Sequence, residues 1–266
     1  MKTTKLLILT CVLVLNTVYA QENSAIDDTA KAYEMPRTQV IQINNSETDA
    51  LNTLYIKLPK GYEKNTDLKY PVLYFTNPLE NIERLSALSG HLIKDVIIVG
   101  LTWSKGINYG NLDSYVKFLR NDVFKMVESK YRADAERRTY FGYSAAALVG
   151  TYILSKHHNA FENYILGAPV LGVDHEVIQQ IYELESTTAE KRKKMKANVF
   201  FAYGTLEKKK DIQGFKNFIN MLENINDENL TVEHVVIEGE DHRTAEPMAA
   251  IRSMYWLAGL LKKQGI

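Results

Sequence analysis

The sequence predicts an α/β fold, a three-layer sandwich in which a mostly parallel central sheet carries helices on both faces. Two patterns in the 266 residues predict it. Strand-like and helix-like segments alternate along the chain, which is typical of parallel sheets with crossover helices. Several strand-like segments are also apolar throughout, as expected for strands that are covered on both faces. The composition, 45% hydrophobic and 24% charged, is that of a globular protein.

The individual elements follow from local patterns. The predicted strands are rich in β-branched and aromatic residues between turn-forming residues, and they span 38–43, 52–59, 70–75, 95–103, 163–170, 198–204 and 230–239, with a further strand from residue 137 into a tight turn at 142–144. The predicted helices repeat apolar residues at helical spacing, and they cover a short stretch after 78, then 111–131, 145–156, 175–186, 215–225 and 246–263. In such a sheet, ligands bind at the carboxyl ends of the strands.

The first twenty residues have the order of a secretory signal peptide. Two lysines precede an apolar run, and the small-residue end VYA precedes Gln21. The run is short for a membrane span, which needs about 20 residues, and a lipoprotein signal would have a small residue where Thr10 precedes Cys11. We therefore expect cleavage after Ala20, a flexible leader at 21–36 and one domain at 37–266. The exported protein would be periplasmic or secreted, without a stable membrane anchor.

The mature chain would contain no cysteine, because Cys11 is the only one, so its core must stand without disulfides. The full chain has 32 basic and 32 acidic residues, and loss of Lys2 and Lys5 leaves a net charge of −2. This near-neutral balance gives no indication of a nucleic-acid partner. The sequence has no His, Cys and Asp cluster with metal-ligand spacing and no glycine-rich phosphate loop. We therefore expect neither a metal nor another cofactor.

Residues 142–146, Gly-Tyr-Ser-Ala-Ala, stand between a strand-like and a helix-like run. A serine in a sharp strand-to-helix turn is forced outward, and the positions two before and two after it must be small. Gly142 and Ala146 meet that requirement. Ser144 is therefore the candidate nucleophile, and an ordinary small-residue turn is the alternative interpretation.

A serine nucleophile needs a histidine base and a carboxylate that orients the histidine. His242 lies in the loop between the last strand and the C-terminal helix, whereas the other five histidines lie within predicted elements or at their ends. Glu207 follows the strand 198–204 and is the favoured acid, with Asp211 as the second candidate. Because three lysines follow Glu207, it is alternatively one member of a solvated charge run. The chain order serine, acid, histidine is that of the α/β-hydrolases.

An acyl-transfer site also needs N–H donors for the developing oxyanion. The N–H of Ala145, directly after the candidate nucleophile, is one. The other is expected after the strand 70–75, where Pro78 has no N–H and Asn77 or Leu79 remain.

Two aromatic residues are predicted to line the substrate pocket. Tyr143 adjoins the candidate nucleophile, and Trp103 lies just past a strand end. Simple packing is the alternative role for Trp103, because aromatic rings fill cores as well as pockets.

Around the residues named above, the sequence resembles the α/β-hydrolase branch that includes esterase D, feruloyl and acetylxylan esterases, siderophore esterases and mycolyltransferases. The matching stretches follow in order over residues 50–260: IKLPKGYEKNTDLKYPVLYF, KYRADAERRTYFGYSAAALVGTYIL, FENYILGAPV, AYGTLE and EDHRTAEPM. The resemblance implies an α/β-hydrolase fold with Ser144 as nucleophile, Glu207 as acid and His242 as base. It also selects Leu79 as the second oxyanion donor.

The chain departs from that branch at several points. Ala145-Ala146 replaces two glycines, Asn77-Pro78 replaces Asp-Gly, GAPV replaces a Ser-Pro stretch with tryptophans, and no arginine-rich stretch follows Trp103. These departures bear mainly on which substrate the protein would accept, and to a lesser degree on whether it is active.

The predicted function is an exported serine hydrolase that cleaves carboxylic esters, on small molecules or on polysaccharides, through an acyl-enzyme on Ser144. One alternative is a catalytically weak or inactive binding protein on the same fold, in which Glu207 or His242 would be disengaged. The other is a related enzyme, an acyltransferase or a peptidase.

Overall fold

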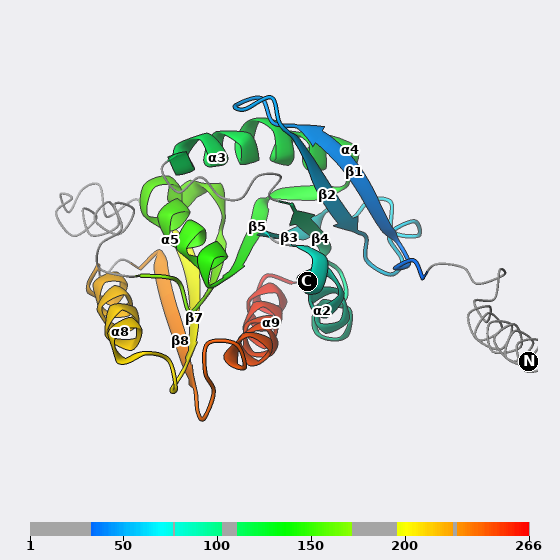
Figure 1. The fold of residues 1–266 in the computed structure, drawn as a ribbon. Helices are drawn as coiled ribbons and strands as arrows, with labels where there is room; N and C mark the ends of the chain where they lie inside the picture. Colours follow the sequence, from blue (N-terminus) through cyan, green and yellow to red (C-terminus); the bar gives the residue numbers. More distant parts are fainter. Residues whose placement is uncertain (1–32, 77, 103–110, 172–195, 226–227, 266) are drawn as a thin grey trace, which may run out of the picture. The chain divides into compact units, whose positions relative to one another are not determined.

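The computed structural model describes residues 33–76, 78–102, 111–171, 196–225 and 228–265 (Figure 1). The chain divides into two compact units, Met1–Pro36 and Arg37–Ile266, and all elements below belong to the second. The predicted signal peptide, the first part of the leader, Trp103 and the predicted helix 175–186 lie outside the described residues.

The strands of the described residues form one sheet with the order β1-β2-β4-β3-β5-β6-β7-β8. The strand β2 pairs antiparallel with β1 and with β4, and every other pair is parallel. This arrangement confirms the predicted mostly parallel sheet. The strands are β1 (Thr38–Asn44), β2 (Leu51–Lys57), β3 (Tyr70–Thr76), β4 (Ile97–Leu101), β5 (Ala133–Tyr143), β6 (Asn163–Gly167), β7 (Ala197–Gly204) and β8 (Leu230–Ile237).

The helices lie between strands in the chain, apart from α9, which follows the last strand. They are α2 (Pro78–Leu92), α3 (Leu112–Phe118), the π-helical segment η2 (Leu119–Phe124), α4 (Lys125–Lys130), α5 (Ala145–His157), the short 3₁₀ turn η3 (His158–Ala160), α8 (Lys209–Asn224) and α9 (Ala245–Lys263). The predicted helix 111–131 is thus helical along its length, with a π-helical middle. Among the described residues, no helix has both the length and the apolar character needed to cross a membrane.

Several element boundaries differ from the predicted ones, and two of the differences have a clear local reason. Helix α8 begins at Lys209, six residues before the predicted start, because its first turn carries lysines and no apolar face marks it. Strand β6 ends at Gly167 rather than at residue 170, since Ala168 has a positive φ of 39° that an extended strand does not allow.

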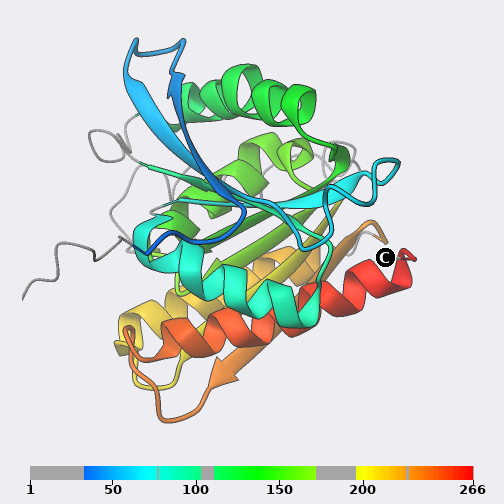
Figure 2. The ribbon, with the colours of Figure 1, turned by 90° about the vertical axis from the view of Figure 1, so that its right-hand side faces the viewer.

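Consecutive rings on β7 show how the two faces of the sheet are covered. The Phe201 ring lies 5.7 Å from Phe215 of α8, and the Phe200 ring lies 5.4 Å from Trp256 of α9. Successive side chains of a strand point to opposite faces, so α8 and α9 lie on opposite sides of the sheet. Helix α2 packs beside α9, and α5 covers the face of α8 (Figures 1 and 2).

The central strands are buried throughout. Every residue of β3, β4 and β6 is buried, including the aromatic side chains of Tyr74, Phe75 and Tyr164. Full burial of a large apolar side chain contributes about 1.5–3 kcal/mol. This core holds the carboxyl ends of β5, β6 and β7 in fixed positions at one edge of the sheet, and the predicted site lies at that edge.

Candidate active site

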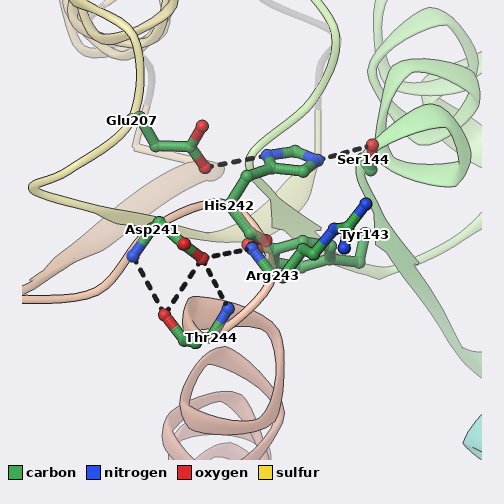
Figure 3. Close-up of polar contacts among 7 residues, drawn as sticks. All are labelled: Tyr143, Ser144, Glu207, Asp241, His242, Arg243 and Thr244. Atoms are coloured by element: carbon green, nitrogen blue, oxygen red, sulfur yellow. Dashed lines mark hydrogen bonds and ion pairs between the residues drawn. The ribbon is translucent and has the colours of Figure 1, made fainter.

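Three side chains from three strand ends form one hydrogen-bonded row (Figure 3). The Nε2 atom of His242 lies 2.8 Å from Oγ of Ser144, and its Nδ1 atom lies 2.9 Å from Oε1 of Glu207. An ionised carboxylate only accepts hydrogen bonds, so Nδ1 donates to Glu207 and Nε2 is left to accept from the serine hydroxyl. The structure therefore brings together the three residues that the sequence singled out, in the order that proton transfer requires.

Ser144 lies in a strained turn between β5 and α5. Its backbone has φ 54° and ψ −118°, a conformation that residues other than glycine rarely adopt. The turn is tight: a β-carbon on Gly142 would lie 2.5 Å from the carbonyl oxygen of Ala146. The N–H of Ser144 donates to the Gly167 carbonyl of β6 at 2.8 Å, which fixes the turn to the sheet. This geometry is a nucleophile elbow, with the hydroxyl raised at the sheet edge.

Glu207 is held in a buried position. It is 8% exposed, whereas the three lysines after it are exposed. Asp211 lies in the first turn of α8, where its N–H donates to the Lys208 carbonyl. The contact to the histidine therefore comes from Glu207, and the interpretation of this residue as part of a solvated charge run is wrong.

The loop that carries His242 is shaped by its neighbour Asp241. The Oδ1 atom of Asp241 accepts from the backbone N–H groups of Thr244, at 2.9 Å, and Arg243, at 2.8 Å. These two N–H groups, together with the Thr244 hydroxyl, hold the pKa of Asp241 below its ordinary value. The bonds close a turn immediately before α9 and fix the backbone from which the imidazole projects (Figure 3).

The loop of the acid and the loop of the histidine are joined by backbone hydrogen bonds. The N–H of Leu206 donates to the Glu240 carbonyl at 2.9 Å, and the N–H of Thr205 donates to the Ile237 carbonyl at 3.0 Å. The N–H of Gly239 donates back to the Thr205 hydroxyl at 2.8 Å. Glu207 and His242 are 35 positions apart in the chain, yet they share one connected scaffold.

Tyr143 takes a position that the sequence did not indicate. Its hydroxyl donates to the backbone carbonyl of His242 at 2.7 Å, and the two rings lie 5.4 Å apart. The predicted contact of Tyr143 with substrate stays a prediction. A tyrosine beside a nucleophile carries no sequence signal for this bond, because the two partners are 99 positions apart.

The two predicted oxyanion donors follow neighbouring strands at equivalent positions along the chain. Phe75 of β3 pairs with Phe141 of β5 in parallel, and Leu79 and Ala145 each follow four residues later. Ala145 is the first residue of α5, and Leu79 belongs to the first turn of α2. The first N–H groups of a helix have no partner within the helix and suit a negative charge. Both residues therefore lie in the first turns of helices that begin at the same edge of the sheet as the serine, and their role as oxyanion donors stays a prediction.

The described residues contain no cluster of three or more His, Cys, Asp or Glu side chains that could hold a metal ion. The row from Glu207 to Ser144 can move a proton without one, because an imidazole that accepts from a hydroxyl and donates to a carboxylate acts as a general base. The arrangement fits nucleophilic attack by a serine.

A serine, a carboxylate and a histidine in this chain order, at the carboxyl edge of a mostly parallel sheet, define an α/β-hydrolase of the serine hydrolase type. The chain belongs to the family described as "Putative esterase", whose model matches residues 46–245. The resemblance that the sequence motifs suggested is thereby confirmed at the level of the family.

Individual relatives agree with this assignment. The chain is 23% identical over 150 residues to the ferri-bacillibactin esterase BesA of Bacillus subtilis (strain 168), a match that covers 55% of this chain and spans about half, 51%, of that protein. The fold is similar to the BES protein from Bacillus cereus, with 18% identity, a TM-score of 0.75 and coverage of 86% of this chain and 98% of the other. It is also similar to the siderophore hydrolase EstB from Aspergillus nidulans, with 15% identity, a TM-score of 0.70 and coverage of 85% and 96%.

Proposed function

We propose that this protein is an exported serine esterase that hydrolyses a carboxylic ester through an acyl-enzyme on Ser144. One observation carries the proposal: the unbroken row from Glu207 through His242 to Ser144, with contacts of 2.9 and 2.8 Å. Family membership supports the ester as the bond that is cleaved.

The first half of the reaction forms the acyl-enzyme. Oγ of Ser144 attacks the ester carbonyl carbon while Nε2 of His242 takes the hydroxyl proton. The N–H groups of Ala145 and Leu79 hold the oxyanion that develops on the carbonyl oxygen. When the carbon–oxygen bond to the alcohol breaks, the imidazolium returns its proton to the leaving alkoxide.

The second half repeats these steps with water. His242 takes a proton from a water molecule, whose oxygen attacks the acyl carbon, and Ser144 leaves with the proton from the imidazolium. Glu207 keeps the imidazole in the required tautomer and stabilises the imidazolium that forms twice in each cycle. Its burial strengthens this effect, since water screens a buried pair of charges less than an exposed one.

The engaged row favours an enzyme over a binding protein on the same fold. A binding protein would have no need to hold Ser144 at a positive φ of 54°, a strain that the surrounding structure must offset. Strain of this kind at a nucleophile positions a reacting atom.

We further propose that the substrate is a small-molecule ester with an apolar or aryl part. Val170 and Leu206 lie just past the carboxyl ends of β6 and β7, and they are 48% and 64% exposed. Large apolar side chains at a strand-end edge provide a surface for an apolar group. The names of the relatives add siderophore esters to the classes that a substrate panel should contain.

The test of the proposed activity uses the mature protein, a fluorophosphonate probe and p-nitrophenyl acetate. We expect labelling and turnover in the wild type, and loss of both in Ser144→Ala. Ser155→Ala is the matched control, because this serine lies on the same helix and its buried hydroxyl donates to the Thr151 carbonyl at 2.9 Å, away from the site. A wild type that is neither labelled nor active would contradict the proposal, and turnover that rises with an added acceptor alcohol would indicate an acyltransferase.

Export has its own test. The pattern of residues 1–20 supports cleavage after Ala20. Expression of the full chain with its leader in a bacterial host, followed by mass measurement of the periplasmic and medium fractions, should give a product that begins at Gln21. Full-length protein confined to the cytoplasmic fraction would contradict export.

A further inference from the structure

The phenol of Tyr143 has no role in the mechanism above, yet it makes a short bond inside the site. Its hydroxyl donates to the backbone carbonyl of His242 at 2.7 Å. Tyr143 directly precedes Ser144, so the bond connects the side chain of the nucleophile's neighbour to the backbone of the base. The two rings lie 5.4 Å apart at an angle of 47°, which places the phenol beside the imidazole (Figure 3).

The histidine loop needs such a contact on this side. Asp241 closes the turn toward α9, and the Glu240 carbonyl is bonded to Leu206 on the side of β7. The first contact fixes the loop relative to α9, and the second fixes it relative to the loop of the acid. The bond from Tyr143 fixes it relative to the nucleophile, and proton transfer from Ser144 depends on that second distance.

We propose that Tyr143 is a positioning residue that holds His242 at hydrogen-bonding distance from Ser144. This inference rests on the proposed esterase function. It replaces direct contact with substrate as the main role of the Tyr143 hydroxyl. The side chain acts through the backbone of His242 and does not itself take part in bond making.

The surroundings of Tyr143 suit this role. A β-carbon on Gly167 would lie 2.3 Å from the Cδ2 atom of the Tyr143 ring, so the missing side chain of Gly167 makes room for the ring. Burial, followed by the nearby charge of Glu207, raises the pKa of the Tyr143 hydroxyl. The phenol therefore stays protonated, and remains a donor, at every pH at which a histidine base is active.

The two roles of Tyr143 predict different kinetics. A hydroxyl that binds the substrate equally in the ground and transition states changes KM and leaves kcat unchanged. A hydroxyl that positions the base changes kcat and leaves KM nearly constant, because substrate binding does not depend on the imidazole. Tyr143→Phe separates the two, since it removes only the hydroxyl and keeps the ring in its place.

The matched control is Tyr164→Phe. The Tyr164 hydroxyl also donates to the backbone carbonyl of a histidine, His158, at 3.0 Å, but at the start of β6 and away from the serine. Both variants therefore lose the same kind of bond from a tyrosine on the sheet. Thermal unfolding of each variant checks that the fold is intact before kinetics are compared.

We expect Tyr143→Phe to lower kcat and the rate of fluorophosphonate labelling about three- to tenfold, with KM within about twofold of wild type, as a lost neutral hydrogen bond would do. Tyr164→Phe should leave all three nearly unchanged. A rise in KM at constant kcat, or no change in Tyr143→Phe, would overturn the inference and leave the esterase proposal standing.

A spectroscopic readout decides the inference even if the wild type hydrolyses no ester. The ¹⁵N chemical shift of the His242 Nε2 atom reports the hydrogen bond that it accepts from the Ser144 hydroxyl, and its change in Ser144→Ala calibrates the loss of that bond. We expect Tyr143→Phe to move this shift toward the Ser144→Ala value and Tyr164→Phe to keep the wild-type value. A wild-type shift in Tyr143→Phe would refute the positioning role.

Discussion

Gly204 and Glu240 touch backbone to backbone: a β-carbon on Gly204 would lie 2.1 Å from the Glu240 carbonyl oxygen. Gly204 ends β7, three residues before Glu207, and Glu240 lies two residues before His242. The approach of these two chains brings the acid and the base together. No residue other than glycine fits at position 204 without moving the histidine loop.

Replacement of Gly204 by alanine is therefore expected to disturb the site. The new methyl group must push the loop at Glu240 away, which separates His242 from Glu207 and Ser144. We expect kcat for ester hydrolysis to fall by at least about tenfold, because a displacement of a catalytic group by about 1 Å can lower the rate about 100-fold. Gly214→Ala in α8 is the control, since its nearest atoms would lie at an ordinary 3.5 Å, and it should stabilise the helix by up to about 1 kcal/mol. Equal activity in the two variants would contradict the prediction.

The two candidate acids can be told apart by isosteric replacement. Glu207→Gln keeps the shape of the side chain but removes the charge that stabilises the imidazolium, so kcat should fall by about 10³- to 10⁴-fold. Asp211→Asn should stay within about twofold of wild type, because surface substitutions away from the site have small effects. The ratio of the two kcat values is the measurement, and a larger loss in the Asp211 variant would reassign the acid.

Ala146 lies two residues after Ser144, where the elbow requires a small side chain, and the elbow accommodates its methyl group. Ala146→Gly removes a good helix former from the first turn of α5 and should lower the free energy of unfolding by about 0.5–1 kcal/mol. We expect kcat within about twofold of wild type, since the position already meets the size limit that the elbow sets. Denaturant unfolding and ester hydrolysis measure the two effects. A large gain in kcat would show that the methyl group restricts the nucleophile.

Glu162, which lies away from the active site, is expected to make the stability of the fold depend on pH. It lines a crevice at the amino-terminal ends of β5, β6 and β7, and its buried Oε2 atom has no hydrogen-bond partner among the residues that the structure describes. Burial raises its pKa above the ordinary 4.5, although Lys196 opposes the shift. Because the pKa of Glu162 is higher in the folded than in the unfolded chain, protonated Glu162 adds to the free energy of unfolding. This contribution is fully present below the ordinary pKa and is lost as the pH rises through the pKa of the folded state.

Glu162→Gln should therefore flatten the dependence of stability on pH. The variant is neutral at every pH, so its Tm relative to wild type should increase from pH 4 to pH 8. Glu136→Gln is the control, because that side chain is exposed in the same crevice. A Tm difference between Glu162→Gln and wild type that stays constant over this range would show that Glu162 titrates alike in the folded and unfolded chain.

Much of the fold could be predicted because the signals are local. Continuous apolar strands such as β3, and the small residues around Ser144, depend only on neighbours in sequence, and the structure has them where the pattern placed them. The start of α8 was missed because a lysine-rich first turn has no apolar period. Trp103 lies outside the described residues, so its predicted role in the pocket stays a prediction.

The sequence by itself determined the class of fold and the strand ends at which chemistry was to be sought, since residue period, turn chemistry and chain order are properties of neighbouring residues. Only the tertiary structure decided that Glu207 rather than Asp211 contacts the histidine, and that the Tyr143 hydroxyl reaches the His242 backbone. The physical reason is that both contacts join residues far apart in the chain. Their distances are set by how the core packs β5, β7 and the last loop against one another.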